Sequence, residues 1–590
     1  MVKLLKYLKP YWALVLLMLL LLLGQAIAEL FLPTLMAGIV DEGISRAVIE
    51  GTPQTQYILR TGLHMLTIAL LAGCASILVG YLAPRISAGM ARDLRRDLFT
   101  KAESFSQAEF DRFPSASLIT RCTNDVSQVQ GLANVTARML IYAPIMGIGG
   151  VFMALTRSVA MGWIIALAVI ILIGMVVVIV SIVMPKFQLM QELVDRLNKV
   201  SREILHGLMV IRAFGTQQHE RERFDGANTD LRDTSLFVGR VMAITGPAIG
   251  FIMAGTSMLV IWVGAHQVDG GNMFVGDMMA FMQYAMQVIF AFMMISMVLI
   301  MLPRALVSAQ RINEILDTEL VITDPDTPQE FSQTKGVVSF ENVVFRYPNA
   351  EADAVSNISF TAQPGQTTAI IGATGAGKTT LAALLLRFYD VTEGRITLDG
   401  LDIRDVRQVD LRGKIGYVPQ KGQLLTGTIA SNIRYGNVDA TDADIAEIAG
   451  VAQAMEFITE KDEQFDSEIV QGGGNVSGGQ RQRLSIARAL AKAPQILVFD
   501  DSFSALDFAT DAKLRKALKE HTANATVIVI AQRVSTIMGA EQILVLDEGQ
   551  IVGRGTHEEL LKSCPAYNEI ASSQGVVPQG ATDNEEVQNG

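Results

Sequence analysis

A short glycine-rich loop is the part of this chain whose residue spacing points most directly to chemistry. Gly372, Gly377, Lys378 and Thr379 fit the pattern G-x-x-x-x-G-K-[ST]. In this pattern backbone N–H groups turn toward phosphate oxygens, the lysine reaches the β- and γ-phosphates, and the hydroxyl binds Mg²⁺. The apolar run 367–371 precedes the loop and a helix-like run follows it, so a positive helix terminus would face the phosphates. The predicted ATP-binding residues of this loop are Gly372, Thr374, Gly375, Ala376, Gly377, Lys378, Thr379 and Thr380.

A second chemical element follows about 120 residues later, where the apolar run 496–499 ends in Asp500 and Asp501. A hydrophobic strand that ends in Asp supplies the acidic partner of the Mg²⁺ held by such a loop. We therefore expect Asp500 to bind Mg²⁺ together with Thr379. The two elements together predict an ATP site that uses Mg²⁺ as its cofactor.

Between these elements lies the run Val476–Arg483, with the sequence VSGGQRQR. With this run in place, the chain resembles the ATP-binding cassette (ABC) transporter family over nearly its whole length. The resemblance implies that a signature made of four residues clamps the γ-phosphate of an ATP held by an opposite subunit. Each ATP site then needs two cassettes. The signature residues are Ser477, Gly478, Gly479 and Gln480.

The resemblance also assigns roles to isolated positions. It implies that Tyr347 stacks on adenine, although a tyrosine considered alone would more often be a packing residue. It implies that Gln420 senses Mg²⁺ and the attacking water, which adds Gln420 to Thr379 and Asp500 as a metal-site residue. It places Ser504 and Asp507 in a loop that crosses the interface between two cassettes.

Three residues depart from the family pattern. Asp501 stands where most members have the Glu that polarises the attacking water, and Gln532 stands where most have a His that contacts the γ-phosphate. Gln471 stands where a cross-linking loop usually has Glu. A base must lie about 2.6–3.2 Å from the proton that it takes, and a retreat of ~1 Å can cost about 10²-fold. Gln donates a hydrogen bond but carries no titratable positive charge.

These departures predict a chain that does not work alone. We expect Asp501, Gln532 and Gln420 to be the catalytic residues of a degenerate site that cleaves ATP poorly. The intact signature would complete the hydrolytic site of a second half-transporter, so that the two chains form a heterodimer. The alternative is a homodimer with a weakened catalytic Asp.

The composition favours a membrane protein. Half of the 590 residues are hydrophobic and the mean hydropathy is +0.34, which is unusual for a soluble protein. The net charge of −11 argues against nucleic acid as a partner. The three cysteines are far apart and follow no C-x-x-C pattern, so we expect free thiols.

Six stretches reach the roughly 20 apolar residues that span a ~30 Å hydrocarbon core. They lie near 12–39, 61–83, 136–156, 161–184, 241–264 and 278–302. Lys and Arg concentrate in the two long segments 84–135 and 185–240, so the positive-inside rule places these segments and both termini in the cytoplasm. Bacterial plasma membrane is the expected location.

Each long segment, folded as two helical arms, would extend the membrane helices by about 35–40 Å. The resemblance implies coupling helices near Phe110–Asp125 and Phe214–Glu220. Beyond the membrane part, short β-branched runs alternate with helix-like runs, which indicates an α/β ATPase domain after an all-α membrane domain. The expected parts are a cytoplasmic elbow helix (1–10), a transmembrane domain (11–302), a linker (303–335), a nucleotide-binding domain (336–574) and a disordered tail (575–590).

Two features of the membrane part are candidates for contact with cargo. Glu29 lies inside the first span, where a carboxylate is costly and a functional candidate, although a place in an outer water-filled cleft or pairing with a neighbouring helix is the slightly favoured explanation. The sixth span carries flexible methionines that suit varied ligands, although methionine stripes are often ordinary packing. The candidate residues of this span are Met282, Gln283, Met286, Gln287, Met293 and Met297.

The resulting expectation is ATP-driven export of hydrophobic or amphipathic compounds, with multidrug efflux as the first hypothesis. Export of lipid or peptide is the alternative. A hypothesis from a different class is an ATP-gated channel without pumped cargo. The presence of all coupling elements in their expected order disfavours the channel.

Overall fold

The computed structural model describes residues 2–46, 54–331, 335–348 and 350–576. It divides into two compact units. The membrane unit comprises Met1–Glu103 and Ser115–Thr318, and the ATPase unit comprises Ser104–Pro114 and Glu319–Gly590. Most of the tail predicted to be disordered, from residue 577 onward, lies outside the described residues.

Six helices of the described chain are long and apolar enough to cross a membrane, which confirms the predicted fold class. Four of them run for 42 to 53 residues, more than twice the roughly 20 that a bilayer requires. They therefore continue as helical arms beyond the hydrocarbon. The six are α1 (Trp12–Gly38), α3 (Thr55–Glu103), α6 (Val126–Arg157), α7 (Gly162–His206), α9 (Gln217–Asp269) and α10 (Val275–Leu316).

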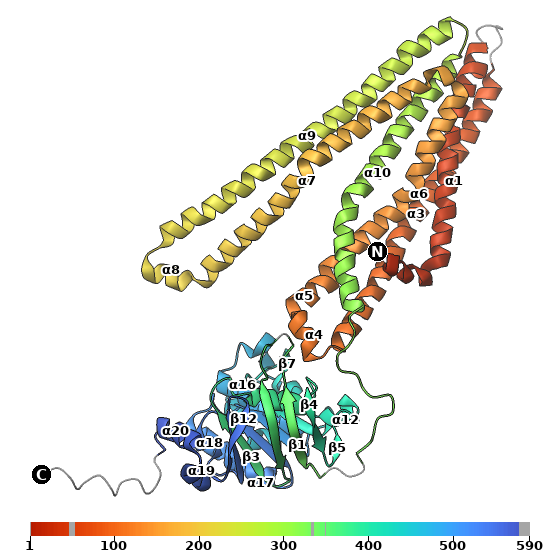
Figure 1. The fold of residues 1–590 in the computed structure, drawn as a ribbon. Helices are drawn as coiled ribbons and strands as arrows, with labels where there is room; N and C mark the ends of the chain where they lie inside the picture. Colours follow the sequence, from red (N-terminus) through yellow and green to blue (C-terminus); the bar gives the residue numbers. More distant parts are fainter. Residues whose placement is uncertain (1, 47–53, 332–334, 349, 577–590) are drawn as a thin grey trace, which may run out of the picture. The chain divides into compact units, whose positions relative to one another are not determined.

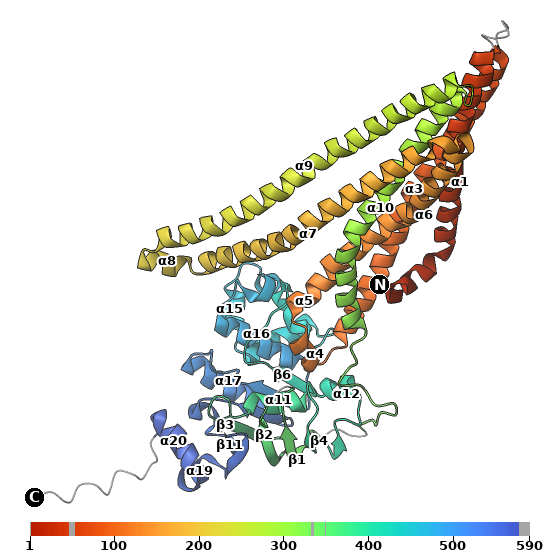
Figure 2. The same ribbon diagram turned by 45° about the horizontal axis from the view of Figure 1, so that its top comes forward.

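Within the membrane unit, α1, α3, α6 and α10 pack together, while α7 and α9 form an antiparallel pair that also contacts α10 (Figures 1 and 2). The core between α1, α6 and α10 contains fully buried Phe281 and Tyr284. Small residues let these helices approach closely: a Cβ at Gly150 would lie 2.9 Å from Val288. The pair α7 and α9 diverges from the other helices toward its connection, the short helix α8 (Leu208–Phe214).

The short helices differ in position from the predicted coupling helices. The second predicted region, Phe214–Glu220, contains the end of α8 and the first turn of α9. Gly215 adopts φ +68°, which ends α8 in a left-handed cap, so the short helix precedes the predicted region. The first region divides into α4 (Gln107–Arg112), α5 (Ser115–Thr120) and the π-helix η3 (Arg121–Asp125). Pro114 separates α4 from α5.

Helix is also present in the first part of the predicted linker and in the N-terminal segment. The predicted linker 303–335 begins as helix, because α10 continues to Leu316 and buries Ala305, Ala309, Ile312 and Ile315 at helical spacing. The N-terminal segment forms the 3₁₀ helix η1 (Val2–Tyr11), which buries Leu4 and Tyr7.

The ATPase unit is built on a sheet of six strands in the order β12-β11-β3-β10-β9-β6. Five of these strands are parallel and β12 is antiparallel. The strands are β3 (Thr367–Gly372), β6 (Ile415–Val418), β9 (Ile496–Asp500), β10 (Thr526–Ile530), β11 (Gln542–Asp547) and β12 (Gln550–Gly555). The apolar runs 367–371 and 496–499 noted in the sequence lie within β3 and β9. In this register Ile530 lies between Ile370 and Asp500, so the loops after β3, β9 and β10 meet at one edge.

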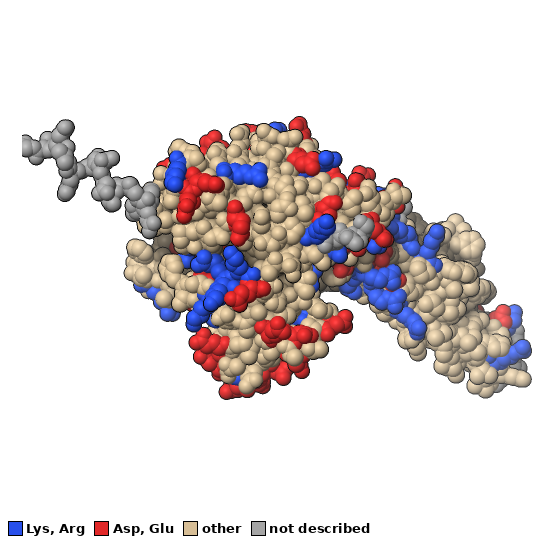
Figure 3. Space-filling view, turned by 90° about the horizontal axis from the view of Figure 1, so that it is seen from below, with Lys and Arg blue, Asp and Glu red and all other residues tan. Residues whose placement is uncertain are grey.

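A second, antiparallel sheet has the order β2-β1-β4-β5. Its strands are β1 (Val338–Phe345), β2 (Val355–Ala362), β4 (Glu393–Leu398) and β5 (Leu401–Asp402), and a small pair joins β7 (Gly427–Thr428) to β8 (Glu468–Ile469). The helices are α11 (Lys378–Leu385), α12 (Gln408–Gly413), α13 (Ile429–Arg434), α14 (Asp442–Val451), α15 (Met455–Thr459), α16 (Gly478–Ala491), α17 (Phe508–His521), α18 (Val534–Ile537), α19 (His557–Ser563) and α20 (Pro565–Ser573). Figure 3 shows one face on which acidic side chains gather along the lower edge of the view and basic side chains form groups of their own.

Candidate nucleotide site

The predicted phosphate loop joins β3 to α11 and is built around glycine. Gly377 adopts φ +92°, and a Cβ there would lie 2.7 Å from the carbonyl oxygen of Ala354. A side chain is therefore excluded at this position by both conformation and space. Helix α11 begins at the next residue, so the unpaired N–H groups of its first turn face the loop. This geometry suits a phosphate group.

Lys378 is folded over its own loop. Its Nζ donates to the carbonyl oxygens of Gly372 at 2.8 Å and Ala373 at 2.6 Å, and the side chain is buried. Burial lowers the pKa of Lys378, while Asp501 and Asp500 act in the opposite direction. The ammonium group is thus held at the mouth of the loop by acceptors that a phosphate could replace.

Asp500 ends the buried strand β9 beside the loop. Its carboxylate accepts a hydrogen bond from Thr379 Oγ1 at 3.1 Å and a longer one from the Tyr417 hydroxyl at 3.4 Å. Burial raises the pKa of Asp500, and the two hydroxyl groups only partly offset this effect. A hydroxyl and a buried carboxylate are hard oxygen ligands, so the residues present fit Mg²⁺.

The raised pKa of Asp500 has a consequence for stability. The folded protein holds this proton more tightly than the unfolded chain, so the ionised carboxylate destabilises the nucleotide-free protein at neutral pH. The penalty is relieved as the pH falls from the raised folded value toward 3.8. We therefore expect Asp500→Asn to raise the Tm of the nucleotide-free protein at pH 7, by about 2–4 °C for each kcal/mol relieved. The gain should shrink as the pH approaches 4.

Thermal unfolding at several pH values measures this effect, and Asp444→Asn is the matched control. Hydrogen bonds from the backbone and hydroxyl of Thr441 lower the pKa of Asp444, so its stabilising effect is present at neutral pH and lost in acid. Asp444→Asn should therefore lower the Tm at pH 7. A lower Tm for Asp500→Asn at pH 7 would contradict the expected sign.

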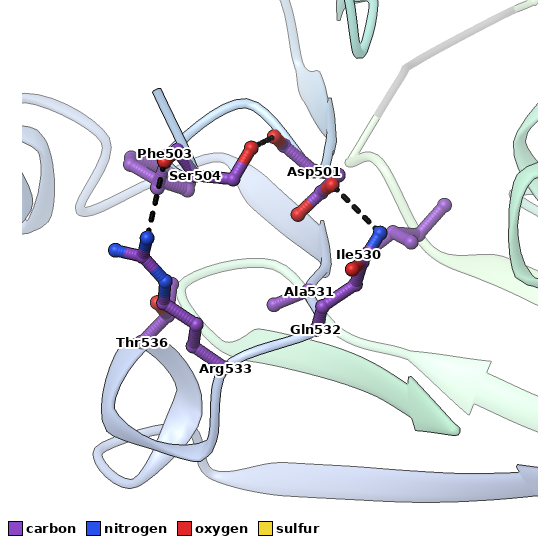
Figure 4. Close-up of a pocket in the computed structure, with 8 residues that line it drawn as sticks. All are labelled: Asp501, Phe503, Ser504, Ile530, Ala531, Gln532, Arg533 and Thr536. Atoms are coloured by element: carbon purple, nitrogen blue, oxygen red, sulfur yellow. Dashed lines mark hydrogen bonds between the residues drawn. The ribbon is translucent and has the colours of Figure 1, made fainter. Parts of the chain in front are cut away.

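The three predicted catalytic residues lie together although they come from three loops. Asp501 Oδ2 accepts from Gln532 Nε2 at 2.9 Å and from Gln420 Nε2 at 3.2 Å. Asp501 adopts φ +47°, and its N–H donates to the Ile530 carbonyl at 2.8 Å. Figure 4 shows Asp501 and Gln532 on the wall of a shallow pocket. The hydrogen bonds of two neutral amides thus go to the same carboxylate oxygen of Asp501 and orient it.

Tyr347 lies within reach of the phosphate loop. Its hydroxyl is 2.9 Å from Thr380 Oγ1, in the first turn of α11, and its ring packs edge-to-face with Phe345 and Tyr389. This placement is compatible with both the adenine contact and the packing role left open by the sequence. Tyr389 was not predicted from the sequence. The signal was present in the aromatic pair Phe388-Tyr389 directly after α11, but its partners are distant in the chain.

The signature begins helix α16. Ser477 is its N-cap, and Ser477 and Gln480 exchange hydrogen bonds at 3.2 and 3.0 Å in a capping box. Ser477 and Gly478 are exposed. Within the described residues, no hydrogen bond joins the signature to the chain's own phosphate loop. The helix start is therefore free to meet a ligand held elsewhere.

The loop with Ser504 and Asp507 lies between the signature and the cluster of predicted catalytic residues. Ser504 Oγ donates to the carbonyl oxygen of Asp501 at 2.9 Å, and Asp507 caps α17 by accepting from Thr510 N–H at 2.9 Å. A Cβ at Gly479 would lie 3.3 Å from the Ala505 carbonyl oxygen. Gln471, the third departure, is exposed in the 3₁₀ turn η6 (Gln471–Gly473).

The candidate cargo residues do not form one site. Glu29 accepts hydrogen bonds from Gln25 and from the Tyr142 hydroxyl, and its backbone carbonyl accepts from Gln287. Met282 packs in the core between α1, α6 and α10, while Met286 and Met293 pack against α7 and α9. Gln283 and Met297 are exposed. Glu29 and Gln287 are therefore the candidates that the structure brings together.

Two protein families match this chain, one in its membrane part and one in its ATPase part. Residues 15–292 match the family described as ABC transporter transmembrane region, and residues 355–504 match the family described as ABC transporter. An uncharacterised ABC transporter ATP-binding protein of Mycobacterium tuberculosis is 41% identical over 575 residues, which cover 97% of each chain.

Two better described proteins are similar over almost the whole length. An ATP-dependent lipid A-core flippase of Chromobacterium violaceum is 31% identical over 585 residues, covering 98% of this chain and 97% of the flippase. The solved structure of a bacterial Atm1-family ABC exporter with ATP bound is 27% identical and has a TM-score of 0.78. The similarity covers 97% of this chain and 99% of that exporter.

Proposed function

Because this chain belongs to the ABC transporter family and is an ATP-hydrolysing exporter, we propose that it is one half of a heterodimer that exports amphipathic, lipid-like compounds. The observation that carries the proposal is the contrast between two parts of the ATPase unit. The catalytic cluster contains Asp501 and Gln532 in place of the usual Glu and His. The signature, by contrast, is intact and exposed at a well-capped helix start.

The chain's own residues would bind MgATP but hydrolyse it slowly. Lys378 and the first turn of α11 would bind the phosphates, and Thr379 and Asp500 would hold Mg²⁺ near Gln420. Bound Mg²⁺ would neutralise phosphate charge. Asp501 is one methylene shorter than Glu. Its carboxylate would therefore lie too far from the attacking water at the γ-phosphate to take a proton efficiently. Gln532 would donate a hydrogen bond without adding positive charge.

The need for a second subunit is supported by the tip of the divergent helix pair in the membrane unit. Helix α8 has no buried residue, and its apolar side chains are open, with Met209 79% and Phe214 77% exposed. An exposed apolar tip on a long helical arm is typical of a docking element. We propose that α8 couples to the ATPase domain of the partner chain. The basic long segments support a cytoplasmic location for both ATPase domains.

The lipid-like cargo is supported by the lipid A-core flippases among the relatives. Multidrug efflux is the second candidate, supported by flexible methionines of α9 and α10 that pack against α7. Glu29 favours neither, because both carboxylate oxygens accept hydrogen bonds from neighbouring side chains. We assign Glu29 to helix association in this proposal rather than to recognition of cationic cargo.

Isolation of the tagged chain from its native membrane tests the heterodimer. We expect a second ABC half-transporter in equal amount, with Glu and His at the positions of Asp501 and Gln532. Proteoliposomes of that complex should move a fluorescent phospholipid between leaflets in an ATP-dependent manner. ATP-dependent dye accumulation without lipid movement would favour multidrug efflux. An ATP-triggered ion current without either would favour a channel.

A further inference from the structure

Tyr389 connects two parts of the ATPase unit that lie far apart in the sequence. On one side its ring packs edge-to-face with the Tyr347 ring, with centroids 5.3 Å apart. On the other side its hydroxyl donates to Asp111 Oδ2 at 2.7 Å. Asp111 belongs to α4, in the segment Ser104–Pro114 that interrupts the membrane unit. One side chain thus contacts both the candidate adenine platform and a segment continuous with two membrane helices.

The segment Ser104–Pro114 is held firmly within the ATPase unit. Glu109 is only 3% exposed, and its carboxylate accepts from the backbone N–H of Val321 and of Ser106, both at 2.7 Å. Phe113 is 2% exposed and stacks on Phe105. A displacement at Asp111 would therefore move the whole segment, because its other contacts keep it compact.

Tyr347 and Tyr389 are also restrained relative to each other. The Tyr347 hydroxyl is tied to Thr380 in the first turn of α11, and Phe345 packs against both rings. Burial and the bond to Asp111 raise the pKa of Tyr389, so its hydroxyl stays protonated and keeps donating at physiological pH. Because both rings are restrained, a displacement of the Tyr347 ring would displace Tyr389 and its hydrogen-bond partner Asp111.

We propose that Tyr389 is a positioning residue that transmits adenine binding at Tyr347 to the segment Ser104–Pro114 through its hydrogen bond to Asp111. The inference rests on the proposed function, because it takes Tyr347 as the adenine platform. It adds a path that starts at the adenine end of the nucleotide, whereas Gln420 lies at the phosphate end beside Asp501. Tyr389 itself touches neither the phosphates nor the reacting water.

Hydrogen exchange of the transporter isolated in nanodiscs, with and without MgATP, tests this path. In the wild type, ATP should slow exchange in the peptide containing Tyr347 and alter exchange in 104–114. In Tyr389→Phe, which keeps the ring, the Tyr347 peptide should respond as before while the response of 104–114 is lost. Loss of a hydrogen bond to a carboxylate predicts about a tenfold fall in transport per ATP hydrolysed. The KM for ATP should stay within roughly twofold.

Matched variants separate transmission from general damage. Asp111→Asn keeps an acceptor for the hydroxyl and should behave like the wild type, whereas Asp111→Ala should reproduce Tyr389→Phe from the other side of the contact. Tyr435→Phe is the control, since Tyr435 is an exposed tyrosine of the same unit, at the end of α13. It should change nothing.

Loss of the transmission path and loss of the adenine contact would give different exchange patterns. An unchanged ATP response of 104–114 in both Tyr389→Phe and Asp111→Ala would overturn the transmission path. Absence of ATP protection at Tyr347 in the wild type would instead overturn the proposed adenine contact, and the path with it.

Discussion

Gly478→Asp in this chain should abolish ATP hydrolysis by the assembled heterodimer, whereas Lys378→Met in the same chain should lower it far less. Gly478 is exposed at the start of α16, and the nearest atom to an added Cβ is the end of the Arg481 side chain at 4.0 Å. The substitution therefore leaves the local fold intact. It places a negative charge where we propose that the partner's γ-phosphate binds, so we expect a loss of about 10²-fold or more.

Lys378→Met acts on the other site of the pair. In the proposed heterodimer Lys378 holds the ATP that is cleaved poorly, so its loss should leave the steady-state rate within roughly tenfold of the wild type. The rate of phosphate release by both variants measures the asymmetry. Gly413→Asp serves as the control, because Gly413 is exposed in the same unit and an added Cβ meets no atom within 4 Å. Equal losses for Gly478→Asp and Lys378→Met would indicate two equivalent sites and refute the heterodimer.

Asp501→Glu combined with Gln532→His should turn this chain, purified alone and dimerised, from a nearly silent ATPase into an active one. The signature and phosphate loop are already intact, so a longer carboxylate and a charged donor are the missing parts. We expect a gain of about 10²-fold, the cost attributed to a ~1 Å retreat of the base. Asp501 and Gln532 line the same shallow pocket (Figure 4), so both substitutions act at one place.

The single variants are the internal controls for this gain. Asp501→Glu alone restores the reach of the base and should recover part of the activity, while Gln532→His alone leaves the base short. Phosphate release should be measured on protein cross-linked at the nucleotide interface, so that all variants are compared as dimers. A brisk rate in the unmodified chain would mean that Asp501 suffices and that the protein is a homodimer.

Much of the fold was predictable because it depends on local patterns. The six spans are long apolar runs, and the strands β3, β9 and β10 are β-branched runs bounded by turn residues. The phosphate loop was predictable for a different reason, since its glycines and lysine act within eight consecutive residues. The end of α10 was harder, because Pro303 and the charged residues that follow conceal the helical spacing of Ala305, Ala309 and Ile312.

The boundaries and contacts of the site were less accessible to the sequence. Gly215, rather than hydropathy, decides where α8 ends, so this short helix lies before most of the predicted region Phe214–Glu220. The methionines of α10 looked like one face, but the neighbouring helices distribute them between separate clusters. The sequence left the role of Glu29 open, because its partner Tyr142 is 113 residues away.

The sequence by itself determined that this chain carries six spans, a phosphate loop, a strand ending in acidic residues and an intact signature with altered catalytic neighbours. Each of these depends on residues close together in the chain, where spacing reports geometry directly. Only the tertiary structure decided that Gln420 and Gln532 donate to the same carboxylate oxygen of Asp501. It also decided that Tyr389 lies between Tyr347 and Asp111. Those contacts join residues up to 278 positions apart in the chain. They arise where parallel strands align their carboxyl ends and where a membrane-side segment packs into the ATPase unit.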